Sequence, residues 1–370
     1  MKTKILFYID TLNGGGAEKV LRTLVNSMDQ TKFDITVQTT FQESAKDFLC
    51  DGITYKYCYK KQTTVTNMLF RIEAALGLVY PLHIKDDYDI EVAYLECGST
   101  KIISSSTNKK AKKLAWVHCD LRKITDDAKG FAEKTKSWYE KFDKVICVSQ
   151  NVREGFMELF GNNPKSVVVY NTIDDKEIIE KSSEPLPQGV LKEKLTLLMV
   201  GRLMPSKNYP RLLKTAKTLL NEGFDFDLWI LGEGEDRPKL ENYIRDNCLT
   251  ENIKLFGFQN NPYPFIKNAD LLVCSSNYEG FSTFVTEGLI LGKTVVTTNC
   301  SGMDELLGEN EYGIITENND EAFLDGLRKM LNDTENLNLY AKKAKLRGQQ
   351  FSKKMLTEQT ENLFYKLFDK

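Results

Sequence analysis

The chain alternates short apolar runs with amphipathic segments, and this order limits the folds open to it. Ile5–Asp10 predicts a strand, and Ala17–Met28 carries apolar residues at the spacing of one helix face. Further strands are predicted at 34–40, 89–95, 113–118, 144–149, 166–170, 195–200, 226–231, 253–258, 270–275 and 294–298. Repeated strand–helix units of this kind predict an α/β fold with mainly parallel sheets.

One segment, Glu180–Gly189, interrupts the alternation with serine, proline and glycine. The 370 residues fit two domains of the usual size. We therefore predict Rossmann-like domains at 1–178 and 193–350, joined by a linker at 179–192. Ligands of such sheets sit beyond the carboxyl ends of the strands, so two facing sheets would form an interdomain cleft.

Composition excludes several classes of protein. Lys and Arg number 50 against 52 Asp and Glu, which argues against a nucleic-acid partner. The eight cysteines include no C-x-x-C pair, which argues against a disulfide framework. Only two histidines are present, which excludes a histidine-rich metal site. The N-terminal apolar run is too short for a signal peptide, and no apolar stretch would span a membrane. We expect a cytoplasmic protein, with peripheral membrane association left open.

Two cationic residues follow the first strand of the second half. Arg202, directly after Gly201, and Lys207 would lie at the carboxyl end of that strand, beside a helix start. A forked cation with a point charge suits a diphosphate. The alternative is two solvated surface cations.

A second loop of that half carries two glutamates eight positions apart. Ser282 is a good helix N-cap, and backbone N–H groups around Phe281–Thr283 would form an anion site. Glu287 would lie roughly 7 Å along the helix, within reach of a ribose. Glu279 would face an attached sugar. The alternative for Glu287 is a solvated helix face.

The first half offers a glycine loop and a histidine. Gly14, Gly15 and Gly16 let a ligand approach the backbone, but Lys19 stands where the dinucleotide fingerprint needs glycine. This disfavours NAD; the alternative is a tight turn. His118 ends a strand and would face the cleft, unless it is a structural histidine.

Together these motifs resemble the retaining glycosyltransferases of family four, which have the GT-B architecture. The resemblance rests on 14–18, His118, Gly201-Arg202 with Lys207-Asn208 and, above all, E-x7-E at 279–287, continuing to 298. It implies a nucleotide-sugar donor, most often a UDP-sugar, and places a final helix, 351–370, back on the first domain.

The resemblance also implies roles for matching residues. The implied catalytic set is His118, Glu279, Arg202 and Lys207. The implied donor-binding set is Gly15, Gly16, Gly201, Gly280, Phe281, Ser282, Thr283, Glu287 and Phe258. Gly15 and Gly16 would approach either the diphosphate or the acceptor, and the base would lie against Phe256–Gln259.

The expected reaction transfers a hexose or N-acetylhexosamine to a glycan with retained anomeric configuration. Arg202, Lys207 and the helix start at Ser282 suit the charge on the leaving diphosphate. We expect no cofactor and no metal, because Asp87-x-Asp89 and Asp225-x-Asp227 both begin predicted strands, away from the ligand edge. The alternatives are a non-catalytic nucleotide-sugar-binding subunit, a nucleotide-sugar epimerase or an NAD-dependent oxidoreductase.

Two windows of the first half, Ile53–Ile72 and Cys97–Cys119, contain basic residues and aromatics. Neither window contains an acidic residue. Such surfaces can hold a protein on an anionic membrane, although they are also ordinary solvated faces. With membrane contact, the acceptor would be a lipid-linked sugar, as in bacterial capsule or exopolysaccharide assembly.

Overall fold

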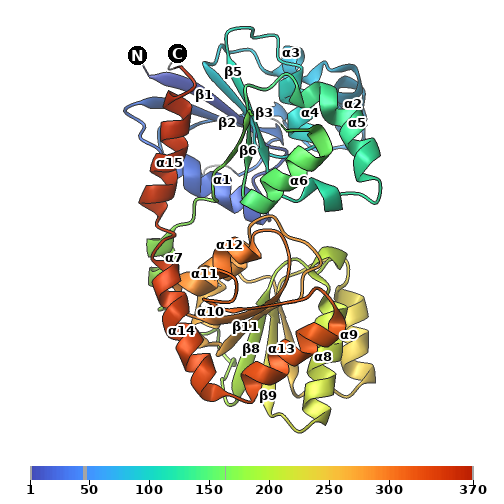
Figure 1. Cartoon of the computed structure of the whole chain (residues 1–370). Helices are drawn as coiled ribbons and strands as arrows, with labels where there is room; N and C mark the ends of the chain where they lie inside the picture. The colour runs from blue at the N-terminus through green and yellow to red at the C-terminus, as the bar shows by residue number, and fades with distance from the viewer. Residues whose placement is uncertain (1, 45–47, 163, 369–370) are drawn as a thin grey trace. The chain divides into compact units, whose positions relative to one another are not determined.

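The computed structural model describes residues 2–44, 48–162 and 164–368 and divides the chain into two compact units. The first comprises 1–173 together with 353–370, and the second comprises 174–352. Each has a parallel sheet with helices packed on it, which is the predicted α/β class (Figure 1).

The second basic window of the sequence, Cys97–Cys119, is flanked by two acidic residues. Glu96 lies directly before it and Asp120 directly after it.

The sheet of the first unit is parallel throughout, in the order β3-β2-β1-β4-β5-β6-β7. Its strands are β1 Thr3–Tyr8, β2 Phe33–Phe41, β3 Thr54–Tyr59, β4 Ile90–Ala93, β5 Lys112–Val117, β6 Lys144–Cys147 and β7 Ser166–Val168. Its helices are α1 Gly16–Ser27, α2 Thr64–Leu76, α3 Val79–His83, α4 Gly98–Ser104, α5 Ala128–Tyr139, α6 Gln150–Phe160 and α15 Lys353–Tyr365. Strand β1, in the interior of the sheet, is mostly apolar and buried, and the sequence predicted it. Strand β3, at the edge, is only partly buried, and the sequence analysis did not predict it.

The second unit has the sheet order β10-β9-β8-β11-β12-β13, also parallel. Its strands are β8 Leu195–Val200, β9 Phe226–Leu231, β10 Ile253–Gly257, β11 Leu271–Cys274, β12 Thr294–Thr298 and β13 Ile314–Thr316. Its helices are α7 Asp175–Lys181, α8 Tyr209–Asn221, α9 Arg237–Asp246, α10 Tyr263–Asn268, α11 Thr283–Ile290, α12 Met303–Leu307, α13 Asp320–Leu331 and α14 Thr334–Gly348.

The unit boundary falls earlier in the sequence than the predicted linker. Helix α7 belongs to the second unit, where Ile178 is buried and the helix packs on α10 and α11. The Asn261 side-chain amide donates to the Lys181 carbonyl at 3.0 Å and to the Glu184 carboxylate at 2.9 Å. The start of segment 179–192 is therefore bound to the second unit, although its Pro and Gly content indicated a free connection.

Strand order reverses once in each sheet. In the first unit the chain runs from β1 to β2 and β3 and then returns to β4 on the other side of β1. In the second unit it runs from β8 to β9 and β10 and returns to β11. The loops after β1 and β4, and those after β8 and β11, diverge at these points, where open α/β sheets bind ligands.

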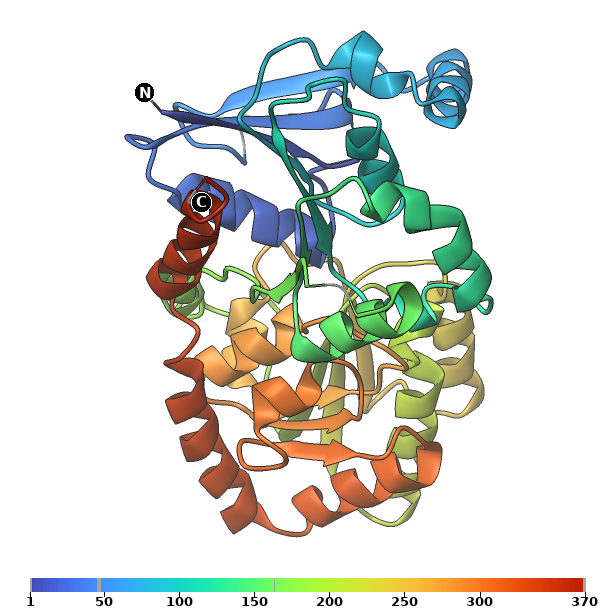
Figure 2. The same cartoon turned by 45° about the horizontal axis from the view of Figure 1, so that its top comes forward.

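The last helix, α15, returns to the first unit, as the resemblance implies, and lies beside α1 (Figure 1 and Figure 2). The fully buried ring of Phe364 lies 6.1 Å from Phe7 and 6.3 Å from Phe33, centroid to centroid. A carboxylate oxygen of Glu361 accepts the backbone N–H of Asp29 at 2.7 Å. Residues more than 300 positions apart therefore share one core.

This packing predicts that Phe364→Ala destabilises the first unit. Removing a fully buried phenylalanine ring costs about 3–5 kcal/mol through lost burial and the remaining cavity. In urea unfolding followed by circular dichroism, the variant should show its first transition at a lower urea concentration than the wild-type chain. The control is Phe368→Ala, whose ring is about half exposed. Equal midpoints for the two variants would contradict this account of the helix.

Candidate functional site

At the reversal point of the second sheet, Lys207 and Glu279 form an ion pair. Lys207 ends a short 3-10 turn, Pro205–Lys207, after β8, and Glu279 lies in the loop after β11. The Lys207 Nζ is 2.5 Å from Glu279 Oε1, which also accepts the Ser276 hydroxyl at 2.6 Å. Burial alone would lower the pKa of Lys207, but the Glu279 carboxylate outweighs it and raises that pKa. Lys207 is therefore a cation at neutral pH.

The two loops are fastened to each other around this pair. The Ser275 hydroxyl donates to the carbonyls of Lys207 and Asn208 at 2.9 and 3.1 Å. The Asn208 side-chain amide donates to that of Asn277 at 2.9 Å. Asn208 also adopts a left-handed conformation, with φ of 47°. A non-glycine residue held in this conformation at a binding loop indicates a geometry fixed by its surroundings.

Arg202 lies next to this site on the same loop. Its side chain is exposed and forms no salt bridge with the residues that the structure describes. The carbonyl of Gly201 accepts the Tyr209 hydroxyl at 2.8 Å, which holds the start of the loop against α8. The loop thus presents a second cation that the fold itself does not neutralise.

The start of α11 is built as predicted. The Ser282 hydroxyl caps the helix by accepting the N–H of Val285 at 3.4 Å. Gly280 and Gly302 pass closely, since a Cβ on Gly302 would lie 2.6 Å from the Gly280 carbonyl. Glu287 is only 5% exposed, so it is not a solvated helix face. Phe281 is buried against Phe351, and Thr283 begins the helix.

The loop after β10 carries the residue predicted to meet the base. Phe258 is 64% exposed, whereas its neighbour Phe256 packs on Trp229 and Phe265. An exposed aromatic ring beside a rigid aromatic cluster could stack on a planar ligand. Its role in base binding stays a prediction.

At the reversal point of the first sheet, Asp10 lies near Glu96, which contacts His118. The backbone N–H of His118 donates to Glu96 Oε2 at 3.0 Å. Its ring stacks on Trp116 at 6.2 Å, and its Nε2 has no hydrogen-bond partner among the described residues. Burial lowers the pKa of His118 to about 3, although a backbone hydrogen bond with Tyr94 acts in the opposite direction. The ring is therefore neutral, and its buried Nε2 has no hydrogen-bond partner among the described residues.

The glycine loop sits on the same edge. Gly15 is the N-cap of α1, and a Cβ at Gly15 would overlap with the carboxylate of Glu18. This carboxylate occupies the position at the helix start where an anion would bind, so the loop favours a hydroxyl-bearing ligand over a diphosphate. Gly16 begins α1 and is exposed.

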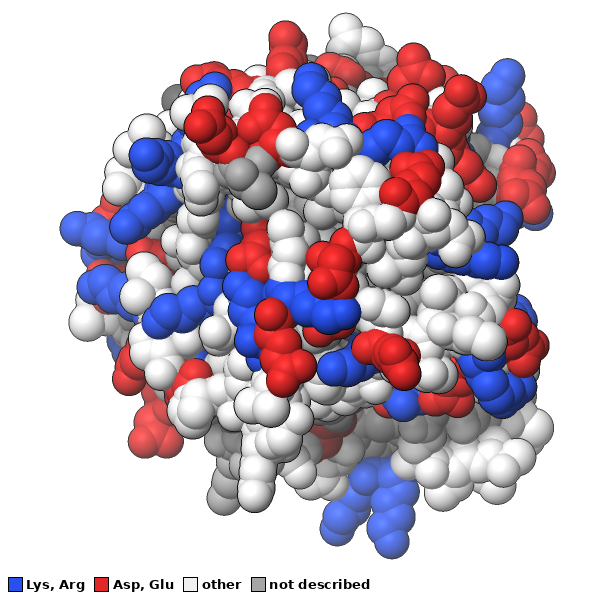
Figure 3. Space-filling model, turned by 90° about the horizontal axis from the view of Figure 1, so that it is seen from below, with Lys and Arg blue, Asp and Glu red and all other residues white. Residues whose placement is uncertain are grey.

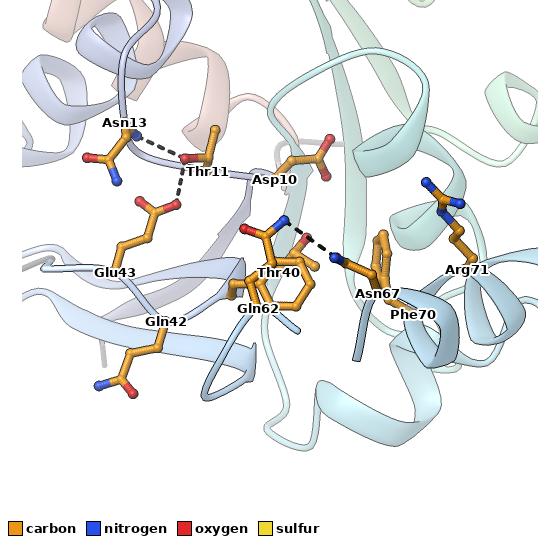
Figure 4. A pocket seen from close by; sticks show the side chains of 11 residues that line it. Asp10, Thr11, Asn13, Thr40, Gln42, Glu43, Gln62, Asn67, Phe70 and Arg71 are labelled. Carbon is orange, nitrogen blue, oxygen red and sulfur yellow. Dashed lines mark hydrogen bonds between the residues drawn. The ribbon is translucent and has the colours of Figure 1, made fainter. Parts of the chain in front are cut away.

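A pocket of about 560 Å³ opens beside this loop, within the first unit (Figure 4). It is lined by Asp10, Thr11, Asn13, Thr40, Phe41, Gln42, Glu43, Gln62, Asn67, Phe70 and Arg71. Glu43 holds the wall in place by accepting the Thr11 hydroxyl at 2.5 Å and the Leu12 N–H at 2.8 Å. Burial and the nearby Glu96 carboxylate raise the pKa of Asp10. Amides, carboxylates and an aromatic ring together suit a ligand rich in hydroxyl groups.

The sequence analysis missed this pocket. Asp10 directly follows a buried strand next to the glycine loop, and that position is a signal that could have identified it. Gln62, Asn67 and Arg71 belong to β3–α2, for which no element was predicted, so no sequence pattern placed them near Asp10.

The two basic windows differ in the structure. In the second window, Lys112 pairs with Asp143 at 3.6 Å, Lys113 donates to the Asn108 carbonyl at 3.1 Å, and Lys101 lies over the Trp138 ring. These contacts explain three of its lysines as parts of the fold. In the first window, Lys60 and Lys61 are exposed and form no salt bridge within the described residues.

The residues that the structure describes contain no group of three or more His, Cys, Asp and Glu side chains placed to hold a metal ion. None of their helices is long and apolar enough to cross a membrane. The face drawn in Figure 3 intersperses Lys and Arg with Asp and Glu, in line with the net charge of −2.

Residues 180–347 match the family described as "Glycosyl transferases group 1". The chain is 28% identical over 359 residues to the Campylobacter jejuni N-acetylgalactosamine-N,N'-diacetylbacillosaminyl-diphospho-undecaprenol 4-alpha-N-acetylgalactosaminyltransferase, covering 95% of this chain and 96% of that protein. It is 27% identical over 347 residues to the Escherichia coli UDP-Gal:alpha-D-GlcNAc-diphosphoundecaprenol alpha-1,3-galactosyltransferase, covering 86% and 85%.

Solved structures show the same fold. The Anabaena protein HepE in complex with UDP has a TM-score of 0.78 and 17% identity, with 98% of this chain and 100% of that chain covered. The sucrose-phosphate synthase of Thermosynechococcus elongatus has a TM-score of 0.82 and 15% identity, with 99% of both chains covered. The architecture is GT-B, with two Rossmann-like units.

The buried environment of His118 predicts its titration behaviour. The folded chain binds this proton only near pH 3, whereas an unfolded chain binds it at about pH 6.5, so the free energy of unfolding rises with pH across that interval. In NMR spectra, the His118 ring signals should stay constant between about pH 5 and 8 and titrate in urea. The His118→Gln variant assigns the signals. A midpoint near the ordinary value in the folded protein would contradict the account.

Proposed function

We propose that this chain, whose residues 180–347 match the group 1 glycosyl transferases, transfers a sugar from a UDP-sugar to a glycan acceptor. The observation that carries the proposal is the Lys207–Glu279 pair, with Arg202 beside it, at the reversal point of the second sheet. The transferred group is a hexose or an N-acetylhexosamine, and the anomeric configuration is retained.

The second unit supplies the chemistry of the leaving group. Breaking the anomeric C–O bond builds negative charge on the diphosphate. Lys207 and the N–H groups at the start of α11 are fixed in place to stabilise this charge, and fixed donors lose little energy to reorganisation. Arg202 adds an exposed cation beside them. These groups can do the work of a metal ion, so we propose transfer without a metal or other cofactor. Glu279 and Glu287 hold the donor sugar and the ribose.

The first unit supplies a nearly neutral, polar surface for the sugars. A neutral His118 can hydrogen-bond a donor hydroxyl through Nε2 without opposing the positive charge that develops on the anomeric carbon. We assign no protein nucleophile, and the leaving phosphate takes the proton of the acceptor hydroxyl. The pocket lined by Asp10, Gln62 and Asn67 holds the acceptor sugar.

Two relatives support a proposal about the acceptor class. The Campylobacter jejuni and Escherichia coli proteins are named for acceptors on diphospho-undecaprenol. We propose a lipid-linked glycan acceptor of bacterial cell-surface polysaccharide synthesis, reached from the cytoplasmic face of the membrane. No nucleic acid takes part in this function.

Substitution of Lys207 tests the donor site. Lys207→Met and Glu279→Gln should each lower kcat about 10²–10³-fold, as the loss of one fixed charge-stabilising group does elsewhere. The assay measures release of UDP from UDP-sugars in EDTA. The matched control is Lys254→Met, an exposed lysine on β10, which should keep normal turnover. Full activity in Lys207→Met, with the fold intact, would reject this donor site, and no turnover in any form would favour a binding subunit.

The acceptor pocket is tested by shortening two amides. The double variant Gln62→Ala and Asn67→Ala should raise the acceptor KM about tenfold, since each lost hydrogen bond costs about 0.5–1.5 kcal/mol. Hydrolysis of the UDP-sugar without acceptor should not change. Gln359→Ala, an exposed amide on α15, serves as the control. An unchanged acceptor KM would place the acceptor elsewhere.

A further inference from the structure

Helix α2 turns a row of large apolar side chains toward solvent. Val65, Met68, Leu69, Ile72 and Leu76 are between 42% and 67% exposed, and no residue of this helix is fully buried. Their spacing puts them on one helix face. No other helix in the described ranges carries more than two large exposed apolar side chains. A continuous apolar face of this kind marks an interaction surface.

The opposite face of α2 belongs to the pocket. Asn67, Phe70 and Arg71 line it (Figure 4). The helical spacing of these three residues puts them on the side of the helix away from the apolar row. Glu73 fastens the helix to the fold by accepting the Tyr59 hydroxyl at 2.5 Å and contacting His83 Nε2 at 2.8 Å. One helix therefore separates the pocket from an exposed apolar surface, at a distance of about 10 Å, the diameter of a helix.

The helix does not need an apolar partner to form. Thr63 and Thr66 make a reciprocal capping box at its start, and Gly77 ends it in the left-handed conformation, with φ of 71°. These caps satisfy the backbone groups at both ends. The exposed row is therefore not explained by the stability of the helix.

Charge indicates what covers the apolar face. Residues 54–85 contain five basic residues and a single acidic one, Glu73, which is tied to Tyr59 and His83. One of the five, Lys56, pairs with Asp86 just beyond this segment, which leaves four basic residues outside that ion pair. Lys60 and Lys61 stand just before the helix, exposed and without a salt bridge to any described residue. The chain as a whole has a net charge of −2, so this segment is a local positive region. Apolar side chains bordered by lysines complement an anionic lipid surface.

We propose that α2 docks the first unit on an anionic lipid bilayer, with its apolar row in the lipid and Lys60 and Lys61 at the headgroups. The pocket on the other face of the helix then opens next to the membrane surface, where a lipid-linked sugar can enter it while the lipid stays in the bilayer. The inference deepens the proposed function and rests on it only for the identity of the acceptor, because the docking surface is defined by α2 itself.

Vesicle flotation tests the docking surface directly. The full chain should float with phosphatidylcholine vesicles that contain about 30% phosphatidylglycerol, and float much less with phosphatidylcholine alone. The triple variant Val65→Ser, Met68→Gln, Ile72→Gln should bind the anionic vesicles at least tenfold more weakly. Lys60→Gln with Lys61→Gln should reduce binding and remove its salt dependence. The matched control is Leu339→Gln with Leu346→Gln, two exposed leucines on α14.

Activity measurements separate this inference from the proposed function. The triple variant should lose transfer to an acceptor embedded in vesicles and keep transfer to a short-chain acceptor in solution within twofold. Vesicle binding by a wild-type chain without transferase activity would reject the proposed function and keep the docking surface. Failure of the wild-type chain to float, or equal flotation of the triple variant, would overturn the docking proposal. So would a concentration-dependent dimer that the triple variant abolishes, because a second copy would then cover the row.

Discussion

All strands of a parallel sheet end at the same edge, and the loops diverge where strand order reverses. In this chain the reversal lies between β1 and β4 in one unit and between β8 and β11 in the other. The second reversal brings Lys207 to within 2.5 Å of Glu279, although the two residues are 72 positions apart in the sequence. The first brings Asp10 near Glu96, whose carboxylate accepts the backbone N–H of His118. Strand order therefore determines where both candidate sites lie, and the side chains in the loops determine the chemistry of each site.

The two edges differ in charge in a way that matches two halves of a transfer reaction. The second unit presents Lys207 and Arg202 beside a helix start, which suits a diphosphate. In the first unit, burial keeps His118 neutral, and the Glu18 carboxylate occupies the start of α1. Amides and carboxylates line its pocket, which suits sugar hydroxyls. This division agrees with a GT-B enzyme in which one unit binds the nucleotide and the other the acceptor.

The sequence predicted the elements whose pattern is regular and missed those whose pattern is not. Strands such as β8 and β11 are short apolar runs, so periodicity and the loop motifs after them located Arg202, Lys207 and Glu279. Strand β3 has the sequence Thr-Tyr-Lys-Tyr-Cys-Tyr and is only partly buried at the sheet edge. It therefore contains no apolar run from which a strand could be predicted. Without β3 and α2, the pocket residues Gln62, Asn67 and Arg71 had no expected position. Proline and glycine at 185–189 suggested a linker, but the burial of Ile178 is a tertiary contact that composition does not contain.

The central claim is that the second unit binds a nucleoside diphosphate through Lys207. Thermal unfolding of the wild-type chain and of Lys207→Met, each with UDP, UMP or NAD in EDTA, tests it most directly, because a ligand that binds only the folded state raises Tm. The account predicts that UDP raises the Tm of the wild-type chain, that UMP does so far less, and that Lys207→Met does not respond. A Tm that rises with NAD and not with UDP, or an equal response of Lys207→Met to UDP, would contradict it.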